Sequence, residues 1–240
     1  MNHRPHIASA FDRDLEAIQA MIMKMGGLVE DAVDKATVAL TEQDGELASQ
    51  VRAGDKRIDA MEWQVNEEAA RVIAQRQPLA TDLRTVLSVF RISASLERIG
   101  DYAKNMAKRS EIIMELHPID GTAPALKRMS KMVQMMLKDA LDAYIQRDAA
   151  LAADVRARDE EVDQMYNGLF REYLTHMMED PRNITACMHL HFLAKNLERM
   201  GDLVTAIAEQ VIYLVSGEMP DDDRAKADYT SIAGREGPAA

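Results

Sequence analysis

One short stretch of this sequence occurs twice, and it constrains the fold more than any other feature. Residues 96–108 read LERIGDYAKNMAK, and residues 197–209 read LERMGDLVTAIAE. Each copy places a glutamate and an aspartate four residues apart, with a glycine directly before the aspartate. Glu97 and Asp101 therefore recur, 101 residues later, as Glu198 and Asp202. A repeat at this distance predicts two structurally equivalent halves.

The repeated motif is unfavourable for an isolated helix. Carboxylates four residues apart lie on one helix face and repel each other by about 0.2–0.5 kcal/mol. Gly100 and Gly201 each cost about 1 kcal/mol relative to alanine in a helix interior. Both copies keep the paired acids and the glycine despite these costs. This indicates that the motif provides something that offsets them. A shared cation would reverse the repulsion, and a glycine would let another backbone or a ligand approach closely.

The rest of the sequence predicts long helices. Only 11 glycines and 7 prolines interrupt the 240 residues, and apolar residues recur at steps of three and four along most of the chain. Six helices are expected, over about residues 9–43, 46–76, 80–115, 124–147, 149–178 and 182–217.

Turn residues divide the chain near its midpoint, at the sequence HPIDG that begins with His117. Other segments also repeat across this point, so that Asp55 and Asp59 correspond to Asp159 and Asp163. The predicted fold class is all-α, with two pseudo-symmetric three-helix bundles. The predicted domains are a first bundle at 1–116, a linker at 117–123, a second bundle at 124–217 and a disordered tail at 218–240.

The net charge and the cysteine content restrict the partners and the compartment that the sequence allows. A net charge of −11 and a pI of about 5.1 argue against nucleic-acid binding, which needs basic clusters. This acidity suits binding of cations or basic partner surfaces. The single cysteine, Cys187, excludes an internal disulfide and suits a reducing compartment. With no apolar signal core and no run of about 18–20 apolar residues, we expect a cytoplasmic protein without membrane insertion.

The familiar catalytic motifs are absent from the sequence. A diiron carboxylate bundle would carry Glu-x-x-His on two helices, and no histidine here follows a glutamate at that spacing. No glycine-rich phosphate loop, G-x-S-x-G motif or Cys/His nucleophile arrangement is visible. We therefore expect no enzyme, no catalytic residues and no organic cofactor. The alternatives are a metal-binding helical scaffold or a carboxylate-bridged metal enzyme.

The repeated motif resembles that of the PhoU family, the phosphate-specific transport system accessory proteins. The resemblance rests on LERIGDxAxNxA, on PLAxDLR at 78–84 and on the second ERMGD, and it covers nearly the whole chain except the tail. It implies a cytoplasmic negative regulator of the phosphate-starvation response. Such a regulator couples the phosphate ABC transporter, through its ATPase subunit, to the sensor histidine kinase and modulates phosphate uptake. The resemblance also implies paired three-helix bundles and a homodimer.

The resemblance further implies metal sites on the repeated motifs. The first would centre on Glu97 and Asp101 and the second on Glu198 and Asp202; the facing carboxylates would be Asp55 and Asp59, and Asp159 and Asp163. Oxygen ligands favour hard or borderline cations such as Mn²⁺, Mg²⁺ or iron. An ordinary solvated acidic face is the alternative.

The second half departs from the family pattern. Leu203 stands where the family often has histidine, and Ala206 corresponds to Asn105. We therefore expect the second site to be weaker or differently ligated. The partner-binding surface is left unassigned.

Overall fold

The computed structural model describes residues 4–116, 119 and 121–220. The described residues form six α-helices, one short 3-10 helix and no strand, which confirms the all-α prediction. The elements are α1 (Arg4–Thr41), α2 (Gly45–Arg76), α3 (Thr81–Met114), α4 (Thr122–Gln146), α5 (Ala149–Glu179), η1 (Pro181–Asn183) and α6 (Ile184–Ser216). Residues 221–240 of the predicted tail, and residues 117, 118 and 120 of the predicted linker, lie outside the described residues.

Equivalent caps start the middle helix of each half. The Asp44 side chain accepts a hydrogen bond from the backbone N–H of Leu47 at 2.9 Å, at the start of α2. The Asp148 side chain likewise accepts from the N–H of Leu151 at 3.0 Å, at the start of α5. Such caps satisfy backbone donors that a helix start leaves open.

The predicted helix boundaries hold within about two residues, except that α1 begins at Arg4 and not near residue 9.

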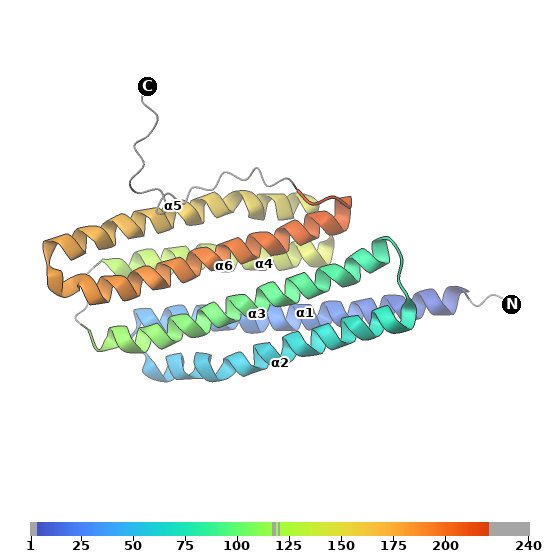
Figure 1. The fold of residues 1–240 in the computed structure, drawn as a ribbon, viewed down its shortest axis with the longest axis horizontal. Helices are drawn as coiled ribbons and strands as arrows, with labels where there is room; N and C mark the ends of the chain where they lie inside the picture. Colours follow the sequence, from blue (N-terminus) through green and yellow to red (C-terminus); the bar gives the residue numbers. More distant parts are fainter. Residues whose placement is uncertain (1–3, 117–118, 120, 221–240) are drawn as a thin grey trace, which may run out of the picture.

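The six helices form two three-helix bundles packed side by side. Helix α2 packs on α1 and α3, whereas α5 packs on α4 and α6. The bundles meet where α1 contacts α4 and α3 contacts α6, so α2 and α5 lie at opposite edges of the molecule (Figure 1). None of the helices in the described part of the chain offers an apolar stretch long enough to cross a membrane.

The predicted apolar stripes are buried. Leu96, Ile99 and Met106 of α3 are at most 1% exposed. Leu197 and Met200 of α6 are completely buried. Together with the stripes of the other helices they form one hydrophobic core that runs through both bundles. Burial of this area is the main stabilising contribution, because it removes apolar surface from water.

The contact between the bundles is close and partly polar. A Cβ atom on Gly26 of α1 would lie 2.5 Å from Leu141 Cδ1 of α4, so this glycine permits the approach of the two helices. The hydroxyls of Thr37 and Ser130 form a buried hydrogen bond of 2.6 Å between the same helices. Between α3 and α6, the Arg109 guanidinium lies 4.3 Å from the ring centre of Phe192.

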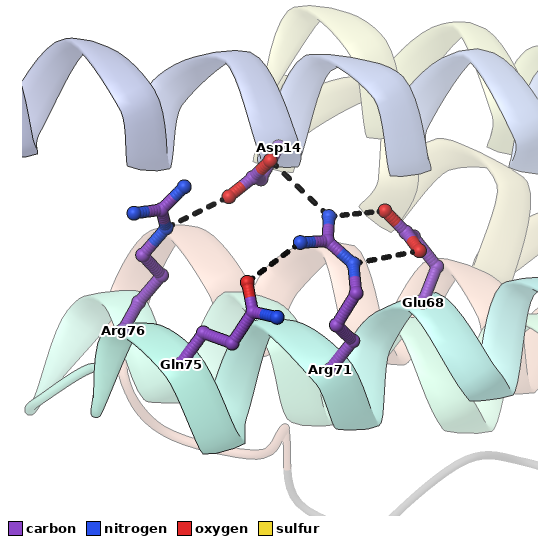
Figure 2. Close-up of polar contacts among 5 residues, drawn as sticks. All are labelled: Asp14, Glu68, Arg71, Gln75 and Arg76. Carbon is purple, nitrogen blue, oxygen red and sulfur yellow. Dashed lines mark hydrogen bonds and ion pairs between the residues drawn. The ribbon is translucent and has the colours of Figure 1, made fainter.

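An ionic cluster ties α1 to the end of α2 (Figure 2). Asp14 accepts hydrogen bonds from Arg76 Nε at 2.9 Å and from Arg71 Nη2 at 3.3 Å. Arg71 also contacts Glu68 and donates to Gln75 at 2.8 Å. The hydrogen bond from Arg76, reinforced by Arg71, lowers the pKa of Asp14. The cluster therefore favours the ionised form of Asp14 in the folded chain.

Candidate functional site

The first carboxylate cluster consists of Asp55 and Asp59 on α2 with Glu97 and Asp101 on α3. Asp55 is buried, with 4% exposure. Asp59 is exposed, and Glu97 and Asp101 are half-buried. The packing of α2 on α3 brings the two pairs together, although they are about forty residues apart in the chain.

A lysine contacts two acids of this cluster. The Lys104 ammonium is bonded to Asp55 Oδ2 and lies 3.4 Å from Asp101 Oδ1. The hydrogen bond to Asp55 is the main reason that the pKa of Lys104 is raised. The pKa of Glu97 is also raised, first by burial and then by the charges of nearby acids, among them Asp101. These carboxylates are therefore close enough to repel each other, and Lys104 offsets part of that repulsion.

The second carboxylate cluster consists of Asp159 and Asp163 on α5 with Glu198 and Asp202 on α6. It is buried more deeply than the first cluster: Asp159 is 2% exposed, and Asp163 and Glu198 are each 6% exposed. By sequence periodicity alone, Glu198 lies opposite the apolar stripe of α6. The structure buries it nevertheless, because that side of α6 faces α5.

Glu198 is only partly satisfied within its cluster. Its Oε1 lies 2.8 Å from the Lys195 ammonium. Among the described residues, its buried Oε2 has no hydrogen-bond partner. Burial raises the pKa of Glu198, and the charges of Asp202 and Asp163 add to this effect. A buried carboxylate oxygen without a donor is costly, so this position would gain from a cation or a proton.

The repeated glycines allow the helices to approach at both clusters. A Cβ atom on Gly100 would lie 2.9 Å from Ile58 Cδ1 of α2. A Cβ atom on Gly201 would lie 3.0 Å from Asp159 Oδ1 and 3.3 Å from Val162 Cγ1 of α5. The close approach expected at these glycines is therefore made by side chains of the neighbouring helix. In the second half, one of those side chains is a carboxylate of the cluster itself.

The two carboxylate clusters differ in how well their oxygen atoms could accept a metal ion. Within the described residues, no three carboxylate, imidazole or thiol groups are gathered closely enough to hold one. In the first cluster, a metal ion bound between Asp55 and Asp101 would have to displace the Lys104 ammonium. In the second cluster, the unsatisfied oxygen of Glu198 suits a hard cation. The assignment of these residues as metal ligands stays a prediction.

The two lysines were not among the sequence-predicted site residues. Lys104 follows Asp101 by three residues, a spacing that brings side chains together on a helix. Lys195 precedes Glu198 by the same spacing. The repeat itself gives no hint of either, because Thr205 corresponds to Lys104 and Ala94 to Lys195. A search for lysines three residues from each acid would have found both.

Comparison with known proteins identifies the family. A family model for the PhoU domain matches residues 22–110 and 126–211, one match in each half. A phosphate-specific transport system accessory protein PhoU homolog of Caulobacter vibrioides is 46% identical over 226 residues, covering 94% of this chain and 98% of that protein. The homolog of Rhizobium meliloti is 45% identical over 234 residues, covering 98% of each chain.

Solved structures agree with the sequence comparison. The crystal structure of PhoU from Pseudomonas aeruginosa has a TM-score of 0.84 at 41% identity, covering 87% of this chain and 100% of that one. The phosphate transport system regulatory protein PhoU from Streptococcus pneumoniae has a TM-score of 0.82 at 29% identity, covering 88% and 99%. Motif, duplication and fold thus agree over both halves, and the chain belongs to the PhoU family.

Proposed function

We propose that this chain is an accessory protein of a phosphate-specific transport system and a negative regulator of the phosphate-starvation response. The observation that carries the proposal is the match over nearly the full length to relatives named as accessory proteins of that system. The solved structure named as a phosphate transport system regulatory protein supports a regulatory role. On this proposal, the protein acts in the cytoplasm by contact with its partners and not as an enzyme.

The proposed partners are the ATPase subunit of the phosphate ABC transporter and the sensor histidine kinase of the pathway. With ample phosphate, the protein holds the kinase in its non-activating state and moderates phosphate uptake. A rigid pair of helical bundles suits this role, because its continuous core holds the surface helices in fixed positions. Homodimer formation is proposed as well, and sedimentation equilibrium of the purified chain tests it.

A reporter of phosphate starvation tests the regulatory proposal. The reporter is measured in cells grown with ample phosphate while this gene is depleted, and again after the intact gene is restored. We expect the reporter to rise on depletion and to fall on restoration. A reporter that stays silent on depletion would contradict negative regulation. Cross-linking of the purified chain to the transporter ATPase subunit and to the kinase then tests each partner separately.

We also propose that the carboxylate clusters bind divalent or iron cations, with Mn²⁺, Mg²⁺ and iron as the candidates. The residues that would hold the ion are Glu97 and Asp101 in the first half and Glu198 and Asp202 in the second, with Asp55 and Asp59, and Asp159 and Asp163, as the facing carboxylates. A bound cation would neutralise acids of two neighbouring helices. Support comes from the burial of Glu198 and its unsatisfied oxygen.

Isosteric variants test cation binding separately from the regulatory role. The variant Glu97→Gln, Asp101→Asn, Glu198→Gln, Asp202→Asn removes four negative charges while keeping side-chain size. Calorimetric titration of metal-free protein with Mn²⁺ should give heat for the wild type and none for this variant. No heat for folded wild-type protein would contradict cation binding. Complementation of the depleted strain by the variant then shows whether the acids matter for regulation.

A further inference from the structure

A line of arginines runs along the face of the molecule where α3 and α6 lie side by side (Figure 1). We call it the arginine seam, and its members are Arg84, Arg91, Arg98 and Arg109 of α3 and Arg199 of α6. We propose that the arginine seam is the docking surface for an acidic amphipathic helix of a partner protein. This inference rests on the proposed function only for the choice of partners that are tested below.

Helical spacing brings the arginines of α3 onto one face. Steps of three and four residues keep to one side of a helix, and positions 84, 87, 91, 95, 98, 102, 105, 109 and 112 read RLRSRYNRI. The matching line of α6, at positions 188, 192, 195, 199, 203, 206, 210 and 213, reads MFKRLAQY. Acids make up 40 of the 240 residues, yet neither line contains one. This face is therefore basic on a chain whose net charge is −11.

Contacts between guanidinium groups and aromatic rings show that the two lines meet. Arg84 of α3 lies 5.3 Å from the ring centre of Tyr213, and Arg199 of α6 lies 5.9 Å from that of Tyr102. The contact at Phe192 described above is a third pair of this kind. Arginine and aromatic side chains thus alternate along the seam from one end of the helix pair to the other.

The seam has charge and apolar surface to offer a partner. Among the described residues, none of its five arginines forms an ion pair with a carboxylate. Arg91, Arg98 and Arg199 are exposed, and beside them Leu87 is 47% and Phe192 42% exposed. Arginine and aromatic residues are enriched at the centres of protein interfaces, where they contribute much of the binding energy.

The carboxylate clusters border the seam and limit the width of what can bind. Glu97 and Asp101 belong to the cluster shared with α2, and Glu198 and Asp202 to the cluster shared with α5. Packed helices lie about 8–10 Å apart, so one further helix, about 10 Å across, fits between these borders. An anionic membrane or a nucleic acid is wider and would bring its phosphates against the bordering acids. A second copy of the chain cannot use the same seam, because arginines would face arginines.

The spacing of the arginines defines the partner helix. Arg84, Arg91 and Arg98 are seven residues apart, which corresponds to a rise of about 10.5 Å between neighbours. A helix lying along the seam meets them with acids at the same heptad spacing. Apolar residues next to those acids contact the exposed leucine and phenylalanine, and basic residues on both flanks face the bordering clusters. Such binding is the helix-in-groove mode of peptide recognition.

A synthetic peptide of this design tests the surface. The probe is a fluorescein-labelled helix of about 21 residues, with glutamates along its centre line, leucines beside them and lysines on both flanks. A control peptide of the same composition exchanges the glutamates and lysines. Fluorescence anisotropy is followed as the full chain is added. We expect about micromolar affinity for the probe and about tenfold weaker binding of the control peptide.

Charge reversal on the protein locates the binding. The seam variant carries Arg91→Glu, Arg98→Glu and Arg199→Glu, and leaves in place the half-buried arginines that join α3 to α6. The control variant carries Arg57→Glu, Arg128→Glu and Arg171→Glu, which reverse exposed arginines of α2, α4 and α5 and change the net charge equally. The seam variant should bind the probe at least about tenfold more weakly than the wild type, and the control variant should match the wild type. Circular dichroism confirms that both variants fold; if the seam variant does not, Arg98→Glu with Arg57→Glu as its control replaces the pair.

The proposed partners extend the test to the intact proteins. Cross-linking to the transporter ATPase subunit and to the kinase is repeated with both variants. The seam variant should lose its cross-link to at least one of the two, and the control variant should keep both. If the wild type cross-links to neither partner, the proposed function fails, whereas the peptide titration still decides the role of the seam.

Three results would overturn the proposal. The first is that the folded wild type does not bind the probe, and the second is that the seam variant binds it as tightly as the wild type. The third is that vesicles containing phosphatidylglycerol sediment the wild type but not the seam variant while the probe does not bind, since the seam would then recognise anionic lipid. Retention of both partner cross-links by the seam variant would likewise show that docking occurs elsewhere.

Discussion

At the scale of single residues, the repeated glycine could serve either of two roles, between which the sequence does not decide. A glycine beside paired acids favours either close helix packing or the approach of a ligand. The structure shows close packing at both positions, against Ile58 in the first half and against Asp159 and Val162 in the second. The motif therefore sets the distance between two helices as well as placing the acids.

Gly100→Leu should destabilise the protein because its side chain has no space against α2. Overpacking costs about 1–3 kcal/mol, and better helix propensity returns about 1 kcal/mol. We expect the free energy of unfolding to fall by up to about 2 kcal/mol in urea titrations. Gly168→Leu is the matched control, because a Cβ on Gly168 of α5 meets nothing within 4 Å. A similar gain in stability for both variants would contradict this account of the glycine.

The acids of both clusters could be found from the sequence, whereas their environment could not. Repetition and family resemblance identified Glu198 and Asp202, but helical periodicity placed Glu198 opposite the core. A helical wheel describes only one helix, and the burial of Glu198 comes from α5 packing on that opposite side. Lys104 and Lys195 were missed for a different reason. Each lies three residues from a motif acid on its own helix, but neither recurs in the other half, so a repeat search does not register it.

At the scale of helices, the predicted ends agree with the structure where a capping aspartate or a proline marks them. The predicted start of α1, which no such residue marks, does not agree. Asp44 and Asp148 cap α2 and α5, and Pro78 follows the end of α2 at Arg76. The start of α1 was placed too late, because the apolar pattern begins several residues after the backbone becomes helical. Periodicity detects the buried part of a helix.

The ionic cluster on α1 and α2 yields a pH-dependent prediction. Hydrogen bonds from Arg76 and Arg71 lower the pKa of Asp14 from its usual value of 3.8. The stabilisation is therefore present above pH 3.8 and is lost as the pH falls through the lowered pKa. At pH 7, Asp14→Asn should lower the free energy of unfolding by about 1 kcal/mol. This difference from the wild type should shrink when the urea titrations are repeated near pH 3.

Asp12→Asn serves as the control for this experiment, because Asp12 is exposed on the same helix. It should leave the free energy of unfolding within about 0.5 kcal/mol of the wild type, as surface substitutions usually do. A deficit for Asp14→Asn that is as large at pH 3 as at pH 7 would show that packing, and not the charge on Asp14, accounts for the contribution of this residue.

At the scale of the whole molecule, the duplication predicted two bundles but not how they join. The inner contacts use different residues in the two halves: Gly26 and Thr37 on α1 meet Leu141 and Ser130 on α4. Pairs of this kind do not repeat in sequence, so a search for internal similarity passes over them. One core nevertheless runs through both bundles. We therefore expect the halves to unfold together.

Gly26→Leu should weaken this coupling, because a side chain at position 26 enters the space of Leu141 on the other bundle. We expect the free energy of unfolding to fall by about 2 kcal/mol and the thermal transition to broaden or separate into two. The adjacent variant Gly27→Leu is the control, since Gly27 is exposed and a Cβ there meets nothing within 4 Å. Leu141→Ala in the Gly26→Leu background should recover part of the loss, because it vacates the contested space. If Gly26→Leu and Gly27→Leu unfold alike in a single sharp transition, the bundles are not coupled through this contact.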